Sequence, residues 1–289
     1  MAMTSSPEVL SVLAHDLRWT IVGLLVPGDL RTGELVSSTG QAPSLVSYHL
    51  ARLRDAGLVR VRRSAADGRD SYHALDLDAL GQAVADMATR IHPALIHPGL
   101  PGEMAGPGLR GDVAGPGLRG DMAGSGLRGD MADPGLQGEV AGPAADPSGS
   151  RTSAQVLFIC SGNSARSPMA AGWLNHLGAG RVTARSAGVT PRPVQPLAVA
   201  AMAEHGVDIS GHQATRVSGL TGHSFTRVVT LCDRARENCG ELPAASAAMH
   251  WSIPDPARAH PPDLDAFRAT ARELHTRIRY LLPALVERS

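Results

Sequence analysis

The chain has 289 residues, enough for two domains that each bury a core of their own. Its 27 basic and 27 acidic residues give a formal net charge of zero. The net charge of the whole chain therefore cannot attract nucleic acid or a membrane surface. Only three cysteines are present, and the chain has neither a signal-like start nor an apolar run approaching about 18 residues. We therefore expect a cytoplasmic protein without membrane contact, in which the cysteines do redox or catalytic work.

Residues 1–97 have the pattern of a small, mainly helical domain. Apolar side chains recur at helical spacing over residues 10–21, and a further helical pattern runs into a break at 39–40. Pro43 suits the first turn of a new helix, which Gly57 ends. The first half of this region therefore predicts a helix-turn-helix.

A hairpin and a last helix follow. Residues 58–63 and 71–75 predict two strands, joined by a basic turn over 66–69. A helix is then expected from residue 77 to about 96, with an apolar face available for dimerisation. Together with the preceding helices, this order of elements is that of a winged helix-turn-helix.

Residues 98–153 differ abruptly in composition. A nine-residue unit rich in glycine and proline recurs from residue 102 to 137. Its glycines do not fall at every third place, which excludes a collagen helix, and it has too few apolar side chains to offset the cost of ordering the chain. We expect a flexible linker; the alternative is an array that binds a partner.

Residues 154–289 alternate short apolar strands with helices, which is typical of an α/β domain with a parallel, four-stranded sheet. The expected strands are 156–159, 181–184, 227–231 and about 250–253, and the expected helices are 167–177, 196–204 and 263–282. This half is therefore predicted to be a second, separate domain.

The run Cys160-Ser161-Gly162-Asn163-Ser164-Ala165-Arg166-Ser167 follows the first of these strands. Backbone N–H groups of a tight loop and of a helix start can converge on one oxyanion, and such a field favours the thiolate form of Cys160 as a nucleophile. The planar fork of Arg166 suits two oxygens of a bound anion. The alternative is a buried cysteine with an unrelated arginine nearby.

Three more residues fit chemistry at this loop. Asp255 follows an expected strand and lies between prolines, so it could protonate an oxygen that leaves the anion, although a plain turn aspartate is the alternative. Cys232 ends another strand and could approach Cys160, because strand ends gather at one edge of an α/β sheet. Cys239 lies seven residues further, roughly 10 Å away in a helix, so a disulfide would need that segment to unwind. The alternative is two inert buried thiols.

Residues 155 to about 282 resemble thioredoxin-coupled arsenate reductases built on the low-molecular-weight tyrosine phosphatase fold. The matching stretches are Cys-Ser-Gly-Asn-Ser-Ala-Arg-Ser at 160–167, Ser-Ala-Gly at 186–188, Pro-Leu-Ala-Val at 196–199, Val-Thr-Leu-Cys at 229–232, Cys239, and His-Trp with Asp-Pro-Ala at 250–257. Phosphatases of this fold usually have an aromatic residue after Asp-Pro. Ala257 stands there instead, which favours a small inorganic substrate.

The resemblance implies the roles of the site residues. Cys160 would attack arsenate held by the loop and Arg166, with Asp255 as proton donor. Cys232 would then attack Cys160 and release arsenite, and Cys239 would take over the disulfide for reduction by thioredoxin. The oxyanion would be bound by the loop residues Ser161, Gly162, Asn163, Ser164, Ala165 and Ser167, with no bound cofactor. Ala165, Pro168 and Pro254 depart from the family pattern.

Residues 8 to about 90 resemble ArsR-type repressors, whose Ser-His-His-Leu core corresponds to Ser47-Tyr48-His49-Leu50 here. The resemblance implies that this region binds double-stranded DNA as a homodimer. We expect Ser44, Ser47, Tyr48 and His49 to reach base edges, and Arg52, Arg62, Arg63 and Arg69 to contact phosphates. Arsenic-sensing members have a cysteine pair where this chain has residues 34–38 without cysteine, so we expect no metal site.

These observations lead to one main hypothesis and two alternatives. The main one is an arsenate reductase fused to a DNA-binding regulator. The first alternative is a tyrosine phosphatase fused to such a regulator, acting on a phosphate ester. The second is a transcription factor whose C-terminal half only senses an oxyanion or the redox state.

Overall fold

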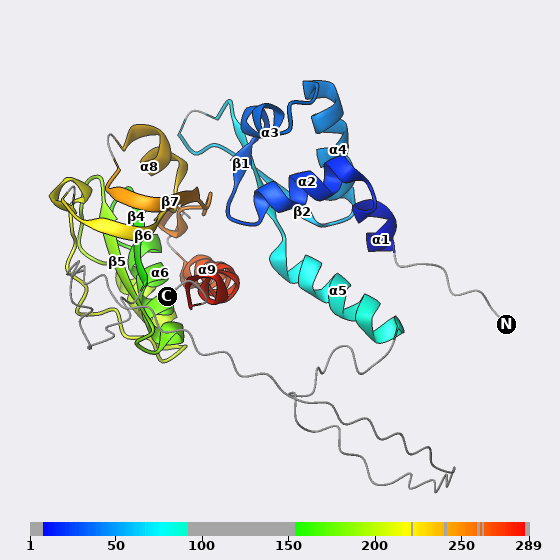
Figure 1. Cartoon of the computed structure of the whole chain (residues 1–289). Helices are drawn as coiled ribbons and strands as arrows, with labels where there is room; N and C mark the ends of the chain where they lie inside the picture. Colours follow the sequence, from blue (N-terminus) through cyan, green and yellow to red (C-terminus); the bar gives the residue numbers. More distant parts are fainter. Residues whose placement is uncertain are drawn as a thin grey trace, which may run out of the picture. The chain divides into compact units, whose positions relative to one another are not determined.

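The computed structural model describes residues 8–66, 68–91, 154–220, 222–239, 242–258, 261 and 263–286 (Figure 1). The predicted linker at 98–153 lies outside the described residues, and so does the predicted end of the helix that begins at Leu77.

The N-terminal half has the predicted helix-turn-helix and hairpin. Its elements are α1 (Glu8–Leu13), α2 (Asp16–Leu25), β1 (Leu30–Arg31), α3 (Thr32–Thr39), α4 (Pro43–Asp55), β2 (Val59–Arg63), β3 (Ser71–Leu75) and α5 (Leu77–Ile91). The three strands form an antiparallel sheet in the order β1-β3-β2. Side chains from α2, α3 and α4 are buried in a common core, among them Ile21, Leu35, Val46 and Leu53.

Two details of this half differ from the prediction. The single helix expected over residues 10–21 is two helices, because His15 caps the start of α2: its Nδ1 accepts a hydrogen bond of 3.2 Å from Leu17 N. Strand β1 was not predicted, since two residues are too few to show a periodic pattern.

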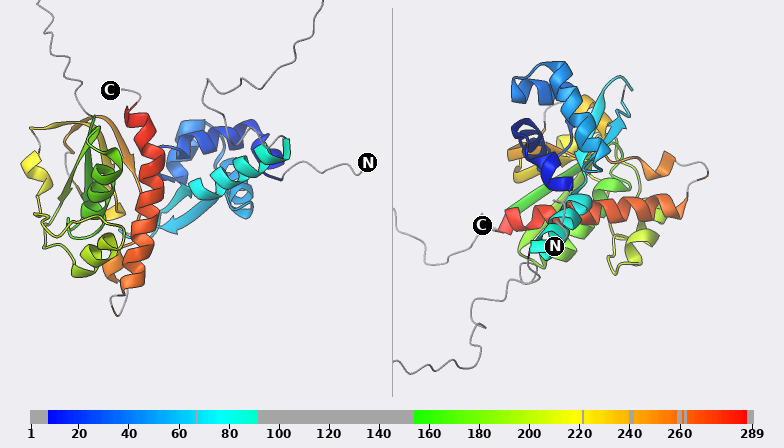
Figure 2. Two further views of the ribbon diagram at one scale, coloured as in Figure 1. Left: turned by 90° about the horizontal axis from the view of Figure 1, so that it is seen from below. Right: turned by 90° about the vertical axis from the view of Figure 1, so that its right-hand side faces the viewer.

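The C-terminal half is the predicted parallel α/β domain. The elements are β4 (Ala154–Cys160), α6 (Arg166–Gly178), β5 (Val182–Gly188), α7 (Pro196–Ala203), η2 (Val217–Leu220), β6 (Ser224–Thr230), α8 (Asp233–Asn238), β7 (Ala244–His250), η3 (Pro256–Arg258) and α9 (Leu264–Val286). The sheet has the order β5-β4-β6-β7, and its parallel register pairs β4 with both β5 and β6. Helix α6 packs on β4 and β5, and α9 packs against α6 and α7 (Figure 2).

The strand predicted at about 250–253 was misplaced. Strand β7 ends at His250, and the residues after it have no regular structure up to Asp255. The strand itself has the sequence Ala-Ala-Ser-Ala-Ala-Met-His, which has few residues that favour a strand, whereas the apolar Trp251 and Ile253 are buried in the loop. Burial of these two side chains therefore produced a strand-like pattern outside the strand.

The described residues of both halves belong to one compact unit, which the sequence did not predict. Asp29, between α2 and β1, is 2% exposed and pairs with Arg277 of α9 through contacts of 2.7 and 3.2 Å. Its Oδ2 also accepts a hydrogen bond of 2.7 Å from Ser252 N. A buried carboxylate needs such partners, so this residue ties the N-terminal half to the loop that leads to Asp255.

Candidate active site

The loop between β4 and α6 is held by the segment that follows β5. Four of its carbonyl groups accept hydrogen bonds from the backbone of residues 189–195: Cys160 from Val189, Ser161 from Thr190, Gly162 from Arg192 and Ser164 from Gln195, at 2.7–3.3 Å. A trans peptide directs its N–H opposite to its C=O, so the amides of these peptide units point away from that segment. The first N–H groups of α6 also lack partners within the helix. This arrangement suits an oxyanion.

Asn163 fixes the shape of the loop. It is fully buried and has a φ of 48°, a left-handed conformation that asparagine tolerates better than most residues. Its Nδ2 donates to Ser167 Oγ at 3.0 Å and to Ser186 Oγ at 2.9 Å, and its Oδ1 accepts from Thr215 N at 2.8 Å. His212 Nε2 lies 3.1 Å from the same Oδ1. Every polar atom of the side chain is thus used to hold the loop.

Two of these supporting residues, His212 and Thr215, were not identified from the sequence. Burial lowers the pKa of His212, so its neutral ring can donate a hydrogen bond to Asn163. Gly188 ends β5 beside the loop, where an added Cβ would lie 2.7 Å from Asn163 N. Only a glycine allows the loop to approach β5 this closely. No local pattern in the sequence marks His212 or Thr215, because each lies more than 40 residues from the loop.

The sulfur of Cys160 has two hydrogen-bonding neighbours. Asn163 N donates to it at 3.2 Å, and Ser167 Oγ lies 3.0 Å away. Both groups can donate to a thiolate, which is the nucleophilic form of cysteine. The structure therefore places the predicted nucleophile at the focus of the loop, with Ser167 in contact with it.

Arg166 and Asp255 form an ion pair at the same cavity. The distance from Arg166 Nη2 to Asp255 Oδ2 is 2.9 Å, and Arg166 Nη1 donates to Ile253 O at 3.0 Å. The other carboxylate oxygen of Asp255 accepts from Ala257 N at 3.3 Å. Asp255 is about one-third exposed, whereas Arg166 is buried. The residues predicted to act as proton donor and as anion-binding fork thus lie side by side.

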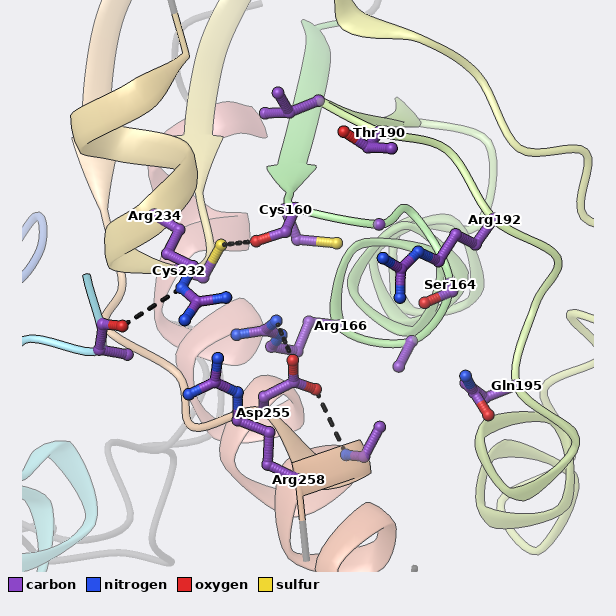
Figure 3. Close-up of a pocket in the computed structure, with 16 residues that line it drawn as sticks. Cys160, Ser164, Arg166, Thr190, Arg192, Gln195, Cys232, Arg234, Asp255 and Arg258 are labelled. Atoms are coloured by element: carbon purple, nitrogen blue, oxygen red, sulfur yellow. Dashed lines mark hydrogen bonds and ion pairs between the residues drawn. The ribbon is translucent and has the colours of Figure 1, made fainter.

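The cavity over the loop has a volume of about 480 Å³. Figure 3 shows Cys160, Arg166 and Asp255 around it, together with three further arginines, Arg192, Arg234 and Arg258, that the sequence did not single out. Each comes from a different element, so no sequence spacing could indicate that they converge. Four guanidinium groups against one carboxylate give the cavity a local field that favours anions, although the whole chain has no net charge.

Cys232 lines the same cavity as Cys160, although the two residues are 72 positions apart in the sequence. Its sulfur lies 3.1 Å from Ser161 Oγ. Cys239 lies at the other end of α8 and is partly buried, and all three thiols are free. Burial raises the pKa of Cys232, an effect that Arg166 opposes, and burial also raises the pKa of Cys239. Both are therefore thiols at neutral pH.

The predicted DNA-reading residues divide into two groups. Ser44, Ser47 and Arg52 are exposed on α4, and Tyr48 is 58% exposed. His49 is only 2% exposed, with its Nδ1 3.4 Å from Arg18 Nη1 and its ring 4.2 Å from that of His15. The expectation for His49 is thus wrong in this arrangement, because its side chain points into the domain and cannot reach a base edge.

The wing arginines also differ from one another. Arg63 and Arg69 are exposed, but Arg62 donates to both carboxylate oxygens of Glu273 in α9, at 2.8 and 2.9 Å, and to Ser252 O. In this arrangement Arg62 is bound to the C-terminal half, which corrects the expectation that it contacts phosphate.

Within the described residues, no group of three or more His, Cys, Asp or Glu side chains could hold a metal ion. No helix in the described ranges is both long enough and apolar enough to cross a bilayer.

Residues 155–289 match the family described as low molecular weight phosphotyrosine protein phosphatase, and residues 15–61 match the bacterial regulatory protein, arsR family. An arsenate reductase of Staphylococcus aureus (strain Newman) is 41% identical over 106 residues, which cover 37% of this chain and 81% of the relative. An arsenate reductase 2 of Staphylococcus epidermidis (strain ATCC 35984) is 40% identical over 102 residues, which cover 35% of this chain and 78% of the relative.

Solved structures with a similar fold include an arsenate reductase from Archaeoglobus fulgidus, with 29% identity and a TM-score of 0.38 over 44% of this chain and 98% of that one. A low molecular weight protein tyrosine phosphatase from T. tengcongensis has 29% identity and a TM-score of 0.40, over 46% of this chain and 99% of that one. The sequence relatives and the family matches establish the family: the chain belongs to the arsenate reductase family through its C-terminal half and carries an ArsR-family helix-turn-helix in its N-terminal half.

Proposed function

We propose that the C-terminal half reduces arsenate with Cys160 as nucleophile and Cys232 and Cys239 as a relay, and that the N-terminal half binds DNA. The observation that carries the first part is the presence of Cys232 in the cavity of Cys160, with its sulfur beside Ser161. A phosphatase of this kind needs only one thiol, whereas removal of an oxygen from arsenic needs a second thiol that can reach the first.

The first step is attack of the Cys160 thiolate on arsenic. The loop amides and Arg166 bind the oxygens of arsenate, and Asp255 protonates the oxygen that leaves as water. In the free site Arg166 is paired with Asp255 at 2.9 Å, so a bound anion would compete with this carboxylate for the guanidinium. An oxygen of the bound anion would then take the place of the carboxylate at the guanidinium.

The second step transfers two electrons. Cys232 attacks the sulfur of Cys160, a disulfide forms, and the pair of electrons from the broken sulfur–arsenic bond leaves with arsenic as arsenite. Cys239 then attacks Cys232 and frees Cys160 as a thiolate. The balance is one arsenate and two thiols giving one arsenite, one disulfide and one water. We propose thioredoxin, a dithiol protein, as the reductant of the final disulfide.

The direct test is arsenate-dependent oxidation of thioredoxin by the purified chain. We expect one thioredoxin to be oxidised for each arsenite released. Arsenite release without a matching loss of thioredoxin thiols would show another reductant, and no release with any dithiol would contradict the proposed reaction.

The pH dependence of the relay separates it from phosphatase chemistry. Burial raises the pKa of Cys232, so pH values between about 6 and 8 lie below it. In this range the fraction of Cys232 present as thiolate rises about tenfold for each pH unit. We expect the single-turnover rate of arsenite release to follow this slope. Hydrolysis of an aryl phosphate does not use Cys232, so its rate should not show this pH dependence. Stopped-flow measurements of both reactions on the same enzyme compare them, and an arsenite-release rate independent of pH would argue against Cys232 as the second nucleophile.

A phosphatase activity is the second candidate, and the size of the cavity favours it. About 480 Å³ leaves space around an inorganic oxyanion for part of an organic ester. Ala257 at the cavity wall offers no ring for an aromatic substrate to stack on. Turnover of aryl phosphate that persists without Cys232 and Cys239 would support this activity.

For the N-terminal half, we propose that a homodimer reads DNA with α4. The exposed residues Ser44, Ser47 and Tyr48 are suited to base edges, and Arg52, Arg63 and Arg69 to phosphates. In gel-shift titrations, Tyr48→Ala should weaken binding to the operator by about tenfold or more, as loss of a base contact does. Binding to unrelated DNA should change little. Equal loss on both DNAs would assign Tyr48 to the backbone instead.

A further inference from the structure

Helix α8 of the catalytic half is bound to the wing of the DNA-binding half, meaning residues 59–75. At the start of the helix, Asp233 Oδ2 accepts a hydrogen bond of 2.6 Å from Ala65 N, and Arg234 Nε donates to Ala65 O at 3.3 Å. Both backbone groups of Ala65 are therefore used by one helix. Ala65 also lines the catalytic cavity, so the tip of the wing forms part of the wall around Cys160.

The remaining charged residues of α8 extend this contact. Glu237 Oε1 accepts from Ser64 Oγ at 3.1 Å and from Tyr72 OH at 3.0 Å. Arg236 forms an ion pair with Glu34 of α3, and its guanidinium lies 5.4 Å from the centre of the Tyr72 ring. Four charged residues, Asp233, Arg234, Arg236 and Glu237, thus join this short helix to the N-terminal half.

The two relay cysteines lie at the two ends of the same helix. Cys232 is the N-cap residue of α8 and Cys239 is its C-cap residue, whose N–H donates to Ala235 O at 3.0 Å. At a rise of 1.5 Å per residue, seven residues of helix separate the two Cα atoms by roughly 10 Å. A disulfide requires Cα atoms about 4.4–6.8 Å apart. The helix must therefore open when this disulfide forms.

We infer that the Cys232–Cys239 disulfide and the contact between α8 and the wing exclude each other, so that oxidation of this pair releases the wing. The inference rests on the proposed function, because that function supplies the oxidant. Arsenate accepts the two electrons, and the two thiols lose two protons as the disulfide forms. The disulfide forms between the sulfurs as α8 unwinds, and the side chains of Asp233 and Glu237 no longer point together at the wing. The redox state of the catalytic centre thus reaches the DNA-binding half.

The coupling must work in both directions. If oxidation weakens the contact between α8 and the wing, then weakening that contact by other means makes the pair easier to oxidise, since the two equilibria are linked. The wing side of the contact offers residues outside the catalytic machinery for this purpose. Ser64 and Tyr72 donate the two hydrogen bonds to Glu237, and neither touches the cysteines.

The experiment uses the full chain carrying Cys160→Ser, which keeps only Cys232 and Cys239 as thiols and cannot turn over arsenate. Oxidation of the dilute protein with diamide then forms the intramolecular disulfide, and mass spectrometry verifies it as a loss of two hydrogens without dimer. Hydrogen exchange is compared before and after. We expect the Ala65 amide to exchange at least about tenfold faster after oxidation, the factor that corresponds to loss of one hydrogen bond to a charged group. Amides of β4 should not change.

The matched control is the same chain with both Cys160→Ser and Cys239→Ser, which cannot form the disulfide under the same treatment. Its wing should exchange at the reduced rate throughout. A fully formed disulfide with no change in wing exchange would overturn the inference, and so would a pair that stays reduced in excess diamide. Neither result bears on arsenate reduction by the unmodified chain, which the thioredoxin assay measures separately.

A second measurement tests the reverse direction. Two chains are compared in buffers with graded ratios of oxidised to reduced dithiothreitol: one carries Cys160→Ser alone, and the other also carries Ser64→Ala and Tyr72→Phe. We expect the Cys232–Cys239 pair of the second chain to become half oxidised at a lower ratio of oxidised to reduced dithiothreitol. An unchanged midpoint would show that the wing contributes nothing to keeping α8 helical, which would also overturn the inference.

Discussion

Replacement of Cys160 by serine should reduce both arsenate reduction and aryl phosphate hydrolysis at least about ten-thousandfold, because loss of the nucleophile leaves only binding and the oxyanion site. The sulfur lies at the focus of the loop, 3.2 Å from Asn163 N and 3.0 Å from Ser167 Oγ. Single-turnover assays with arsenate and with an aryl phosphate measure the two losses on one protein.

Serine is nearly the size of cysteine, so the fold should persist and the variant should still bind the anion. Protection of the Cys160→Ser protein against thermal unfolding by phosphate serves as the control. Retention of either activity above about one per cent would place the nucleophile elsewhere, and loss of anion protection would indicate that the loop itself had collapsed.

The second large effect concerns the relay. Cys232→Ser and Cys239→Ser should each stop steady-state turnover of arsenate with thioredoxin, because the disulfide cannot be passed on. Hydrolysis of an aryl phosphate should remain within about threefold of the unmodified chain, since that reaction uses only Cys160, Arg166 and Asp255. The contrast between the two substrates is the measurement.

The two variants should differ in where the reaction stops. Cys239→Ser still has the thiol that lines the cavity, so one equivalent of arsenite should be released and a Cys160–Cys232 disulfide should accumulate. Cys232→Ser should release none. Sustained turnover by Cys239→Ser would contradict the three-cysteine relay, whereas a burst of arsenite from Cys232→Ser would mean that Cys239 can reach Cys160 directly.

The sequence by itself determined the fold classes and the centre of the site. The signals for the fold are local: helical spacing, the proline and glycine at the ends of α4, and the apolar strand before Cys160. Helices and strands depend largely on hydrogen bonding and burial among nearby residues, so a short stretch of sequence is enough to recognise them. The run from Cys160 to Arg166 is equally local, because a strand, a tight loop and a helix start need no distant residue to be recognised. Asp255 and Cys232 were found because each directly follows an expected strand or lies in a marked loop.

The tertiary structure alone decided how distant parts meet. His212, Thr215 and the arginines at 192, 234 and 258 converge on the site from separate elements, and such convergence leaves no periodic trace in a sequence. The burial of His49 and the pairing of Arg62 with Glu273 likewise depend on neighbours far along the chain. Above all, the contact of α8 with the wing joins residues more than 150 positions apart, because complementary charges and hydrogen-bonding groups meet only once both domains have folded.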